Sequence, residues 1–197
     1  MEKLPDPIEP KLPIAIRNEH IAPYPTTIRI KRHFSILDGG DFTISTCVDD
    51  EAPEDKESKL FYVDSDLVPG RGLSQRRSFL DASGLPVFTL ATKGNGASSY
   101  TWHVELPGDS TAEPVAVLAP RWDLFTNKMH VYVMNAADNG AEVKLEVRGL
   151  VMFWKFTTEV YLDGALVVSA KVKDIRHSQW LVKVARGFDV SLVGHCL

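Results

Sequence analysis

Apolar and polar residues alternate in short segments along most of this chain, and the pattern predicts β-strands. The alternation is clearest in residues 143–148, Val-Lys-Leu-Glu-Val-Arg, which would present one apolar face and one charged face. From Thr27 onward such segments recur at short intervals with turn residues between them, which is typical of a β-sandwich or β-barrel. We expect about twelve strands, near residues 28–31, 42–45, 60–63, 76–80, 87–91, 100–106, 115–119, 128–134, 143–149, 156–162, 166–173 and 180–184.

The turns between these segments carry residues that tolerate a positive φ. Asp138-Asn139-Gly140, Asp163-Gly164 and the run from Asp81 to Gly84 each place Gly, Asn or Asp between two predicted strands. This composition favours tight hairpins, and therefore antiparallel neighbours.

The end of the chain has a different pattern. After the last predicted strand, Asp189 can cap a helix, and the residues that follow are apolar nearly all round. A helix without a polar face must be buried. An otherwise all-β chain that ends in a buried helix at about residues 189–197 suggests a sheet closed around that helix.

The first residues form a proline-rich segment with Pro5, Pro7, Pro10, Pro13, Pro23 and Pro25. Proline removes backbone donors and holds the chain extended, so we expect residues 1–26 to run over the surface or to be partly disordered, as an extension of a domain formed by residues 27–197. Ile14, Ile16 and Ile21 are apolar residues that can dock this extension onto the domain.

Composition narrows the functional classes. The net charge of −4 argues against a general nucleic-acid-binding protein. We expect no signal segment and no transmembrane segment, because no stretch approaches the roughly 20 apolar residues that span a bilayer. Cys47 and Cys196 lie far apart and are expected to be reduced, apolar residues of a cytoplasmic protein.

Sequence motifs for catalysis are weak. The histidines are scattered singly, Ser83 lacks a nucleophile-elbow pattern, and the glycine-rich run at residues 94–96 precedes a strand instead of a helix. The acidic run at residues 49–59 is expected to be a solvated loop. We therefore expect no catalytic residue, no metal site and no cofactor.

Two ordered segments resemble the LURP-one-related proteins, which belong with tubby C-terminal domains and phospholipid scramblases. The first is RSFLDASGLPVFTLATK at residues 77–93, with Trp102 just beyond it. The second runs from Val147 to the end and contains the Asp163-Gly164 hairpin, a lysine-rich strand end and the Asp189 helix start. The resemblance covers roughly residues 34–197. It implies a mainly β, single twelve-stranded antiparallel barrel with a hydrophobic C-terminal helix along its axis. The sequence departs from the family pattern in three places: residues 49–59 and the link at residues 64–73 resemble insertions, and the predicted helix is shorter than is usual in the family.

Basic residues concentrate on the predicted strand near residues 28–31 and on two consecutive segments, near residues 166–173 and 180–184, that are expected to pair. Tubby domains bind phosphoinositide headgroups with Lys and Arg from neighbouring strands, so the resemblance implies candidate headgroup ligands. These candidates are Lys171, Lys173, Arg176, Lys183, Arg29 and Lys31. The alternative is that charges at strand ends keep the barrel soluble and fix the strand register.

The leading hypothesis is a non-enzymatic binding module that associates with phosphoinositide-containing membranes or with a protein partner, in the cytoplasm or peripherally at the membrane. Two alternatives remain open from the sequence. One is a structural or interaction protein without lipid affinity, and the other is a hydrolase whose site is assembled from distant residues.

Overall fold

The computed structural model describes residues 3–33, 41–47, 57–67, 75–93, 101–108, 113–122, 127–152, 155–174 and 178–196. Within these ranges the chain forms twelve strands, one α-helix and short 3₁₀ turns. The strands are β1 Thr26–Arg32, β2 Phe42–Thr46, β3 Ser58–Leu67, β4 Gln75–Asp81, β5 Pro86–Lys93, β6 Thr101–Glu105, β7 Ala116–Trp122, β8 Asn127–Asn135, β9 Ala141–Met152, β10 Lys155–Leu162, β11 Ala165–Val172 and β12 Gln179–Val184. The helix is α1 Val190–Cys196, and the 3₁₀ turns are η1 Asn18–His20 and η3 Ala136–Asp138.

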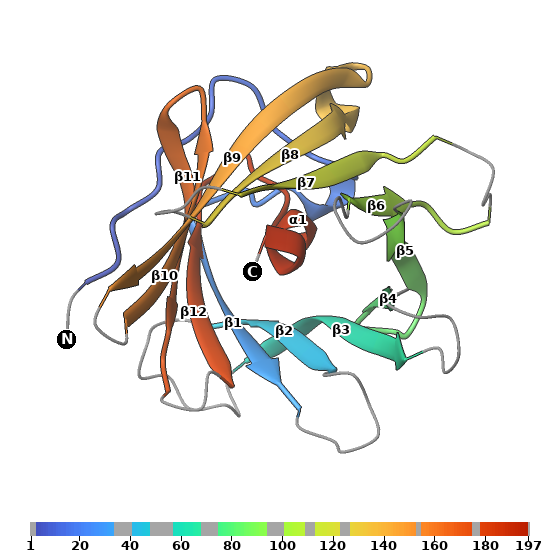
Figure 1. Ribbon diagram of the computed structural model, residues 1–197, viewed down its shortest axis with the longest axis horizontal. Helices are drawn as coiled ribbons and strands as arrows, with labels where there is room; N and C mark the ends of the chain where they lie inside the picture. Colours follow the sequence, from blue (N-terminus) through green and yellow to red (C-terminus); the bar gives the residue numbers. More distant parts are fainter. Residues whose placement is uncertain are drawn as a thin grey trace.

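The strands form a closed antiparallel barrel. Each strand from β2 to β12 pairs with its neighbour in sequence, and β1 closes the barrel by pairing with β12 through Ile28↔Val182 and Ile30↔Trp180. Figure 1 shows this ring of strands around α1. The predicted mainly β, twelve-stranded barrel with a C-terminal helix is confirmed.

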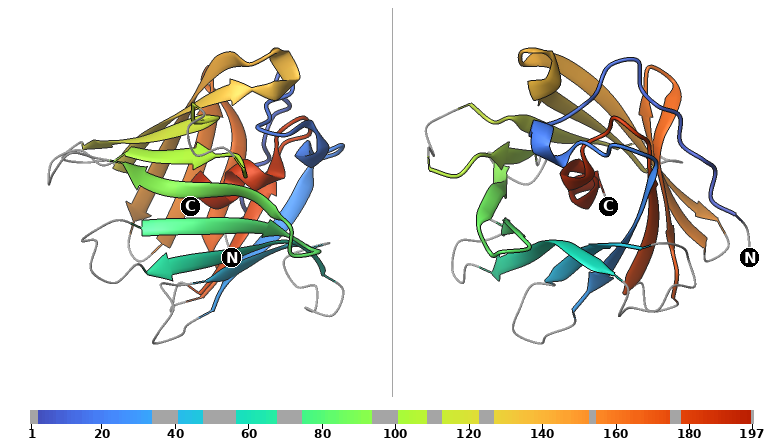
Figure 2. Two further views of the ribbon diagram at one scale, coloured as in Figure 1. Left: turned by 90° about the vertical axis from the view of Figure 1, so that its right-hand side faces the viewer. Right: turned by 180° about the vertical axis from the view of Figure 1, so that it is seen from behind.

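Helix α1 lies inside the barrel, as both views in Figure 2 show. Leu192 and Val193 are completely buried and belong to one hydrophobic core with inward side chains of the strands, such as Ile44 and Phe79. Asp189 caps the helix, because its Oδ1 accepts a hydrogen bond from the backbone N–H of Ser191 at 2.8 Å. Within the described residues, no helix has the length and apolar character needed to cross a membrane.

The predicted hairpins have the expected backbone conformations. Asn139 and Gly140 between β8 and β9 have φ angles of 51° and 80°, and Asp163 and Gly164 between β10 and β11 have φ angles of 49° and 82°. The Asp163-Gly164 pair forms a two-residue hairpin whose left-handed conformation matches the twist of the strands, whereas the β8–β9 connection is longer and contains η3 before Asn139 and Gly140. In the β4–β5 turn, the Asp81 carboxylate instead accepts hydrogen bonds from later residues of the turn.

One predicted boundary is wrong. The sequence suggested a link over residues 64–73, but β3 continues to Leu67 and pairs with β4 through Asp64↔Ser78 and Asp66↔Arg76. The run Asp64-Ser65-Asp66 is polar at consecutive positions, so it lacks the alternation by which strands are recognised. Residues 68–74, the glycine-rich run at residues 94–96 and most of the acidic run lie outside the described residues.

The N-terminal segment, residues 3–25, packs against two parts of the barrel. Its first part runs along the outer face of β11 and β12, where Ile8 N–H donates to Leu166 O at 2.7 Å and the Ser169 hydroxyl donates to Pro5 O at 2.8 Å. Leu4 packs on this face and is 6% exposed. The segment is therefore held along its length despite its prolines.

The second part of the segment crosses the end of the barrel where α1 begins. Ile14 N–H donates to Gly187 O at 2.9 Å, and Ala22 N–H donates to Phe188 O at 3.0 Å. The side chains of Ile14 and Ile16 join the main hydrophobic core. Figure 2 shows this crossing in blue above the red helix.

Candidate anion-binding face

The strand register places most of the predicted headgroup ligands on one outer face of the barrel. Ile28 and Ile30 of β1 point into the core, so the residues between and beside them point outward. The same alternation applies to β11 and β12. The outward basic residues of these three adjacent strands are Arg29 and Lys31 of β1, Lys183 of β12, and Lys171 with Lys173 at the end of β11.

These residues form rows across the sheet. In one row, Leu181 is the cross-strand partner of both Lys171 and Arg29, and Arg29 is also the partner of Ser45 in β2. In the next row, Lys31 is the partner of Gln179, whose carbonyl accepts a hydrogen bond from the Lys173 backbone N–H at 2.9 Å.

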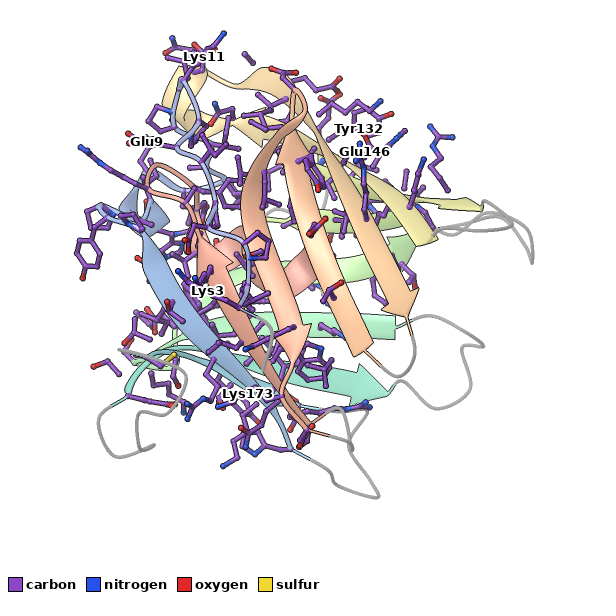
Figure 3. All side chains as sticks on the ribbon, turned by 90° about the vertical axis from the view of Figure 1, so that its left-hand side faces the viewer. Lys3, Glu9, Lys11, Tyr132, Glu146 and Lys173 are labelled. Atoms are coloured by element: carbon purple, nitrogen blue, oxygen red, sulfur yellow. The ribbon has the colours of Figure 1, made fainter. Side chains whose placement is uncertain are left out.

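The five residues therefore share one surface, here named the basic face. Figure 3 shows Lys173 at its lower end. The sixth candidate, Arg176, lies outside the described residues.

Lys183 is engaged by the N-terminal segment. Its Nζ lies 2.5 Å from Asp6 Oδ1 and 3.4 Å from the carbonyl oxygen of Leu4. The hydrogen bond and charge of Lys183 lower the pKa of Asp6, with a smaller contribution from Lys3. The charge of Lys183 is thus partly matched within the protein.

A small apolar cluster divides the basic face. Leu181 packs with Leu4 of the N-terminal segment and with Cys47 after β2, and the three side chains are buried. This cluster lies between the lysines of β11 on one side and Arg29 on the other. The basic face consequently has two halves, one on β11 and β12 and one on β1 and its neighbours.

The second half contains a pocket of about 260 Å³, which we name the β1–β3 pocket. Its lining comes from the outer sides of β1 and β2 and from the start of β3. The lining residues are Arg29, Lys31, His33, Thr43, Ser45, Glu57 and Lys59. Arg29 and Lys31 were predicted site residues, whereas Thr43, Ser45, Glu57 and Lys59 were missed.

Arg29 is nearly buried in this pocket. Its side chain is 6% exposed, and its Nη1 forms an ion pair with Oε1 of Glu57, whose side chain is 11% exposed. A buried guanidinium requires such a partner, because an unpaired buried charge is costly. Glu57 is thus part of a structured site, which corrects the expectation of a solvated loop for this residue.

Other contacts hold the side chains around the pocket. His33 Nε2 lies 3.2 Å from the Thr43 hydroxyl, and Lys59 Nζ lies 5.4 Å from the centre of the Tyr62 ring. The Tyr62 hydroxyl in turn donates to Asp41 at 2.7 Å. An open pocket with a polar lining of this kind can bind a small charged group reversibly.

Arg77 is a separate basic residue on the inner side of the barrel. Its guanidinium lies 5.7 Å from the centre of the Trp102 ring and 5.9 Å from that of Phe42. Burial, with a contribution from Arg32, lowers the pKa of Arg77. Aromatic faces stabilise a cation that water no longer surrounds.

Comparison with known proteins supports the resemblance that the sequence suggested. A family model described as LURP-one-related matches residues 26–194, which is most of the chain. Comparison with curated proteins gave no match, and neither did comparison with solved structures. The matched range begins with β1 and ends within α1, so it contains the barrel and most of the helix inside it.

Proposed function

Because this chain belongs to the LURP-one-related family, we propose that it is a non-enzymatic binding module whose basic face binds the anionic headgroups of phosphoinositide-containing membranes. One observation carries the proposal: Lys171, Lys173 and Lys31 come from strands distant in sequence and lie on one outer face. The proposal places the protein peripherally at the cytoplasmic leaflet, whose lipids are anionic.

The expected binding energy is modest. A basic residue gains about 1 kcal/mol near an anionic leaflet, so three lysines supply about 3 kcal/mol together. The net charge of −4 opposes adhesion of the whole chain, so binding depends on the separation of the basic face from acidic surfaces. Retention should also weaken as salt rises, because the Debye length is about 8 Å at physiological ionic strength.

Co-sedimentation with vesicles tests the proposal. Vesicles of phosphatidylcholine containing phosphatidylinositol bisphosphate should retain the wild type, and pure phosphatidylcholine vesicles should not. The K171E/K173E variant should lose most of this retention. Lys183 is left unchanged in this test because its reversal would also disturb the N-terminal segment through Asp6.

The matched control is K128E/K144E, which changes the net charge equally on β8 and β9. Lys128 and Lys144 lie on strands that are not neighbours of β11 or β12. Equal losses in both variants would mean that net charge alone governs retention. If neither vesicle retains the wild type, the membrane proposal is wrong and an interaction role without lipid affinity takes its place.

A further inference from the structure

The β1–β3 pocket has the properties of a site for a small anion. Its volume of about 260 Å³ lies below the roughly 300–1,000 Å³ of pockets for drug-sized ligands. The side chains lining it that the structure describes are all polar or charged. Such a lining favours a charged, hydrated group over an apolar ligand.

The charges of the described lining residues favour an anion. Arg29, Lys31 and Lys59 are cationic, His33 adds a positive charge when protonated, and Glu57 carries the opposing negative charge. The hydroxyls of Thr43 and Ser45 supply further hydrogen-bond donors. This combination suits phosphate oxygens, which accept several hydrogen bonds and carry up to two negative charges.

The strand geometry spaces the donors around a common point. Arg29 and Lys31 are two positions apart on β1, which separates their Cα atoms by about 7 Å. Ser45 is the cross-strand partner of both Arg29 and Lys59, so these three residues form one row across three strands. A phosphate group placed over Ser45 would therefore have a cationic side chain on either side.

In the structure, Glu57 forms the ion pair with Arg29 that a bound phosphate group would otherwise form. Its carboxylate pairs with the Arg29 guanidinium, which lines the pocket on a side chain that is 6% exposed. We infer that the β1–β3 pocket binds a phosphomonoester group and that Glu57 is an internal competitor, displaced from Arg29 when the group binds.

The position of Glu57 allows this displacement. The residue precedes β3, and the ladder between β2 and β3 begins with Thr46↔Ser58. A rotation of the Glu57 side chain would therefore break no pairing of the barrel. A phosphate dianion beside Glu57 would also repel its carboxylate, which favours the rotation.

This inference rests on the proposed function in that it names the group bound at one half of the basic face. The phosphomonoester can belong to a lipid headgroup or to a free phosphate ester. Binding of soluble inositol 1,4,5-trisphosphate reports the affinity of the pocket without a membrane. Binding to vesicles that contain phosphatidylinositol bisphosphate reports its affinity on a membrane.

Titration calorimetry with inositol 1,4,5-trisphosphate at low salt tests the competition. Glu57→Gln should tighten binding about tenfold, because the amide neither neutralises Arg29 nor repels the phosphate. K31Q/K59Q removes two cations at the pocket, should stay folded because both are surface side chains on strands, and should weaken binding at least tenfold. Thermal melting of each variant establishes that it is folded.

The variants distinguish binding of a phosphate group at the β1–β3 pocket from retention of the whole protein on a membrane. K171E/K173E should lose vesicle retention but change affinity for the soluble probe less than threefold. Binding of the soluble probe without any vesicle retention would disprove the membrane role and leave the pocket standing, with a free phosphate ester as its ligand. The inference is overturned if E57Q binds the probe no more tightly than the wild type, or if neither protein binds it.

Discussion

The carboxylate of Asp189 accepts a hydrogen bond from the backbone N–H of Ile16 at 3.0 Å, across 173 positions of sequence. The same carboxylate caps α1 through Ser191 and also accepts from the Arg17 N–H at 3.2 Å. One buried side chain therefore joins the N-terminal segment to the start of the central helix.

The first prediction concerns pH and Asp189. Burial raises the pKa of Asp189, although hydrogen bonds from Ser191 and Arg17 and the charge of His20 oppose the shift. The folded state therefore holds this proton more tightly than the unfolded state, whose pKa is about 3.9. This stabilisation is complete below the unfolded pKa and is lost as the pH rises through the folded pKa.

Urea unfolding of the wild type and of Asp189→Asn, from about pH 3 to above the folded pKa of Asp189, measures this loss of stability. The free energy of unfolding of the wild type minus that of the variant should fall as the pH rises from about 3 through the folded pKa of Asp189. Asp81→Asn is a control of opposite sign, because hydrogen bonds from Ser83 and Leu85 lower the pKa of Asp81. A difference for Asp189→Asn that does not vary with pH would contradict the prediction.

The second prediction tests the burial of α1. Leu192 is completely buried among core residues, so Leu192→Ala should reduce the free energy of unfolding by about 2–5 kcal/mol. Leu85→Ala is the matched control, because Leu85 is 64% exposed and its truncation should change stability by no more than about 0.5 kcal/mol. Equal small effects of the two substitutions in urea unfolding would mean that α1 does not support the core.

The third prediction concerns the close approach of α1 to the barrel wall. A Cβ added at Gly194 would lie 2.9 Å from Ile44 Cδ1 and 2.9 Å from Phe79 Cε1. Gly194→Ala gains about 1 kcal/mol of helix propensity, but overpacking costs about 1–3 kcal/mol, so we expect a net loss of stability.

Ile44→Val provides a partial rescue of Gly194→Ala, because it removes the Cδ1 atom that the new methyl group would meet. The double variant should be more stable than the sum of the two single effects predicts. Strict additivity in a double-mutant cycle would show that the two positions do not meet.

The fourth prediction concerns the attachment of the N-terminal segment. Asn135 is 1% exposed; its Oδ1 accepts from the Ala15 N–H at 2.9 Å, and its Nδ2 donates to Pro13 O at 2.9 Å. Asn135→Ala leaves the buried Ala15 donor without this acceptor, which should cost about 1–3 kcal/mol.

Hydrogen exchange reports where that stability is lost. The Ala15 amide should exchange faster in Asn135→Ala than in the wild type. The exchange rates of amides in the centre of β9 should change only by the amount that the change in global stability accounts for. Unchanged protection at Ala15 would show that Asn135 does not hold the segment in solution.

The strands, hairpins and terminal helix were predicted well because their sequence signals are local, whereas the choice of a barrel over a sandwich came from the buried helix and the family resemblance. Alternation identified each strand, Asp163-Gly164 and similar pairs identified the hairpins, and the apolar ending identified α1. Prediction failed where consecutive residues of a strand are polar, as at residues 64–66, because no periodic contrast marks such a strand. The docked N-terminal segment was expected only in outline, since the pairing partners of its backbone lie far away in sequence.

The candidate site was predicted in part for the same reason. The basic residues of β1, β11 and β12 could be read from the chain, and β11 and β12 were expected to pair, but the pairing of β1 with β12 is known only from the structure. The pocket depends on which strands flank β1, so Thr43, Ser45 and Lys59 had no sequence signal of their own. Glu57 was hidden in an acidic run, where nothing in the sequence distinguishes the carboxylate that pairs with a buried arginine from the other carboxylates of the run.

The pairing of β1 with β12 has a consequence for biogenesis. A ribosome delivers β1 early and β12 and α1 late, so the nascent sheet carries an unpaired edge and an unfilled interior for most of translation. Contacts between such remote segments make folding slow, because the entropy cost of closing a long loop comes before the favourable free energy of strand pairing. Maturation of this protein is therefore expected to depend on protection of that edge from aggregation until synthesis reaches the last strand.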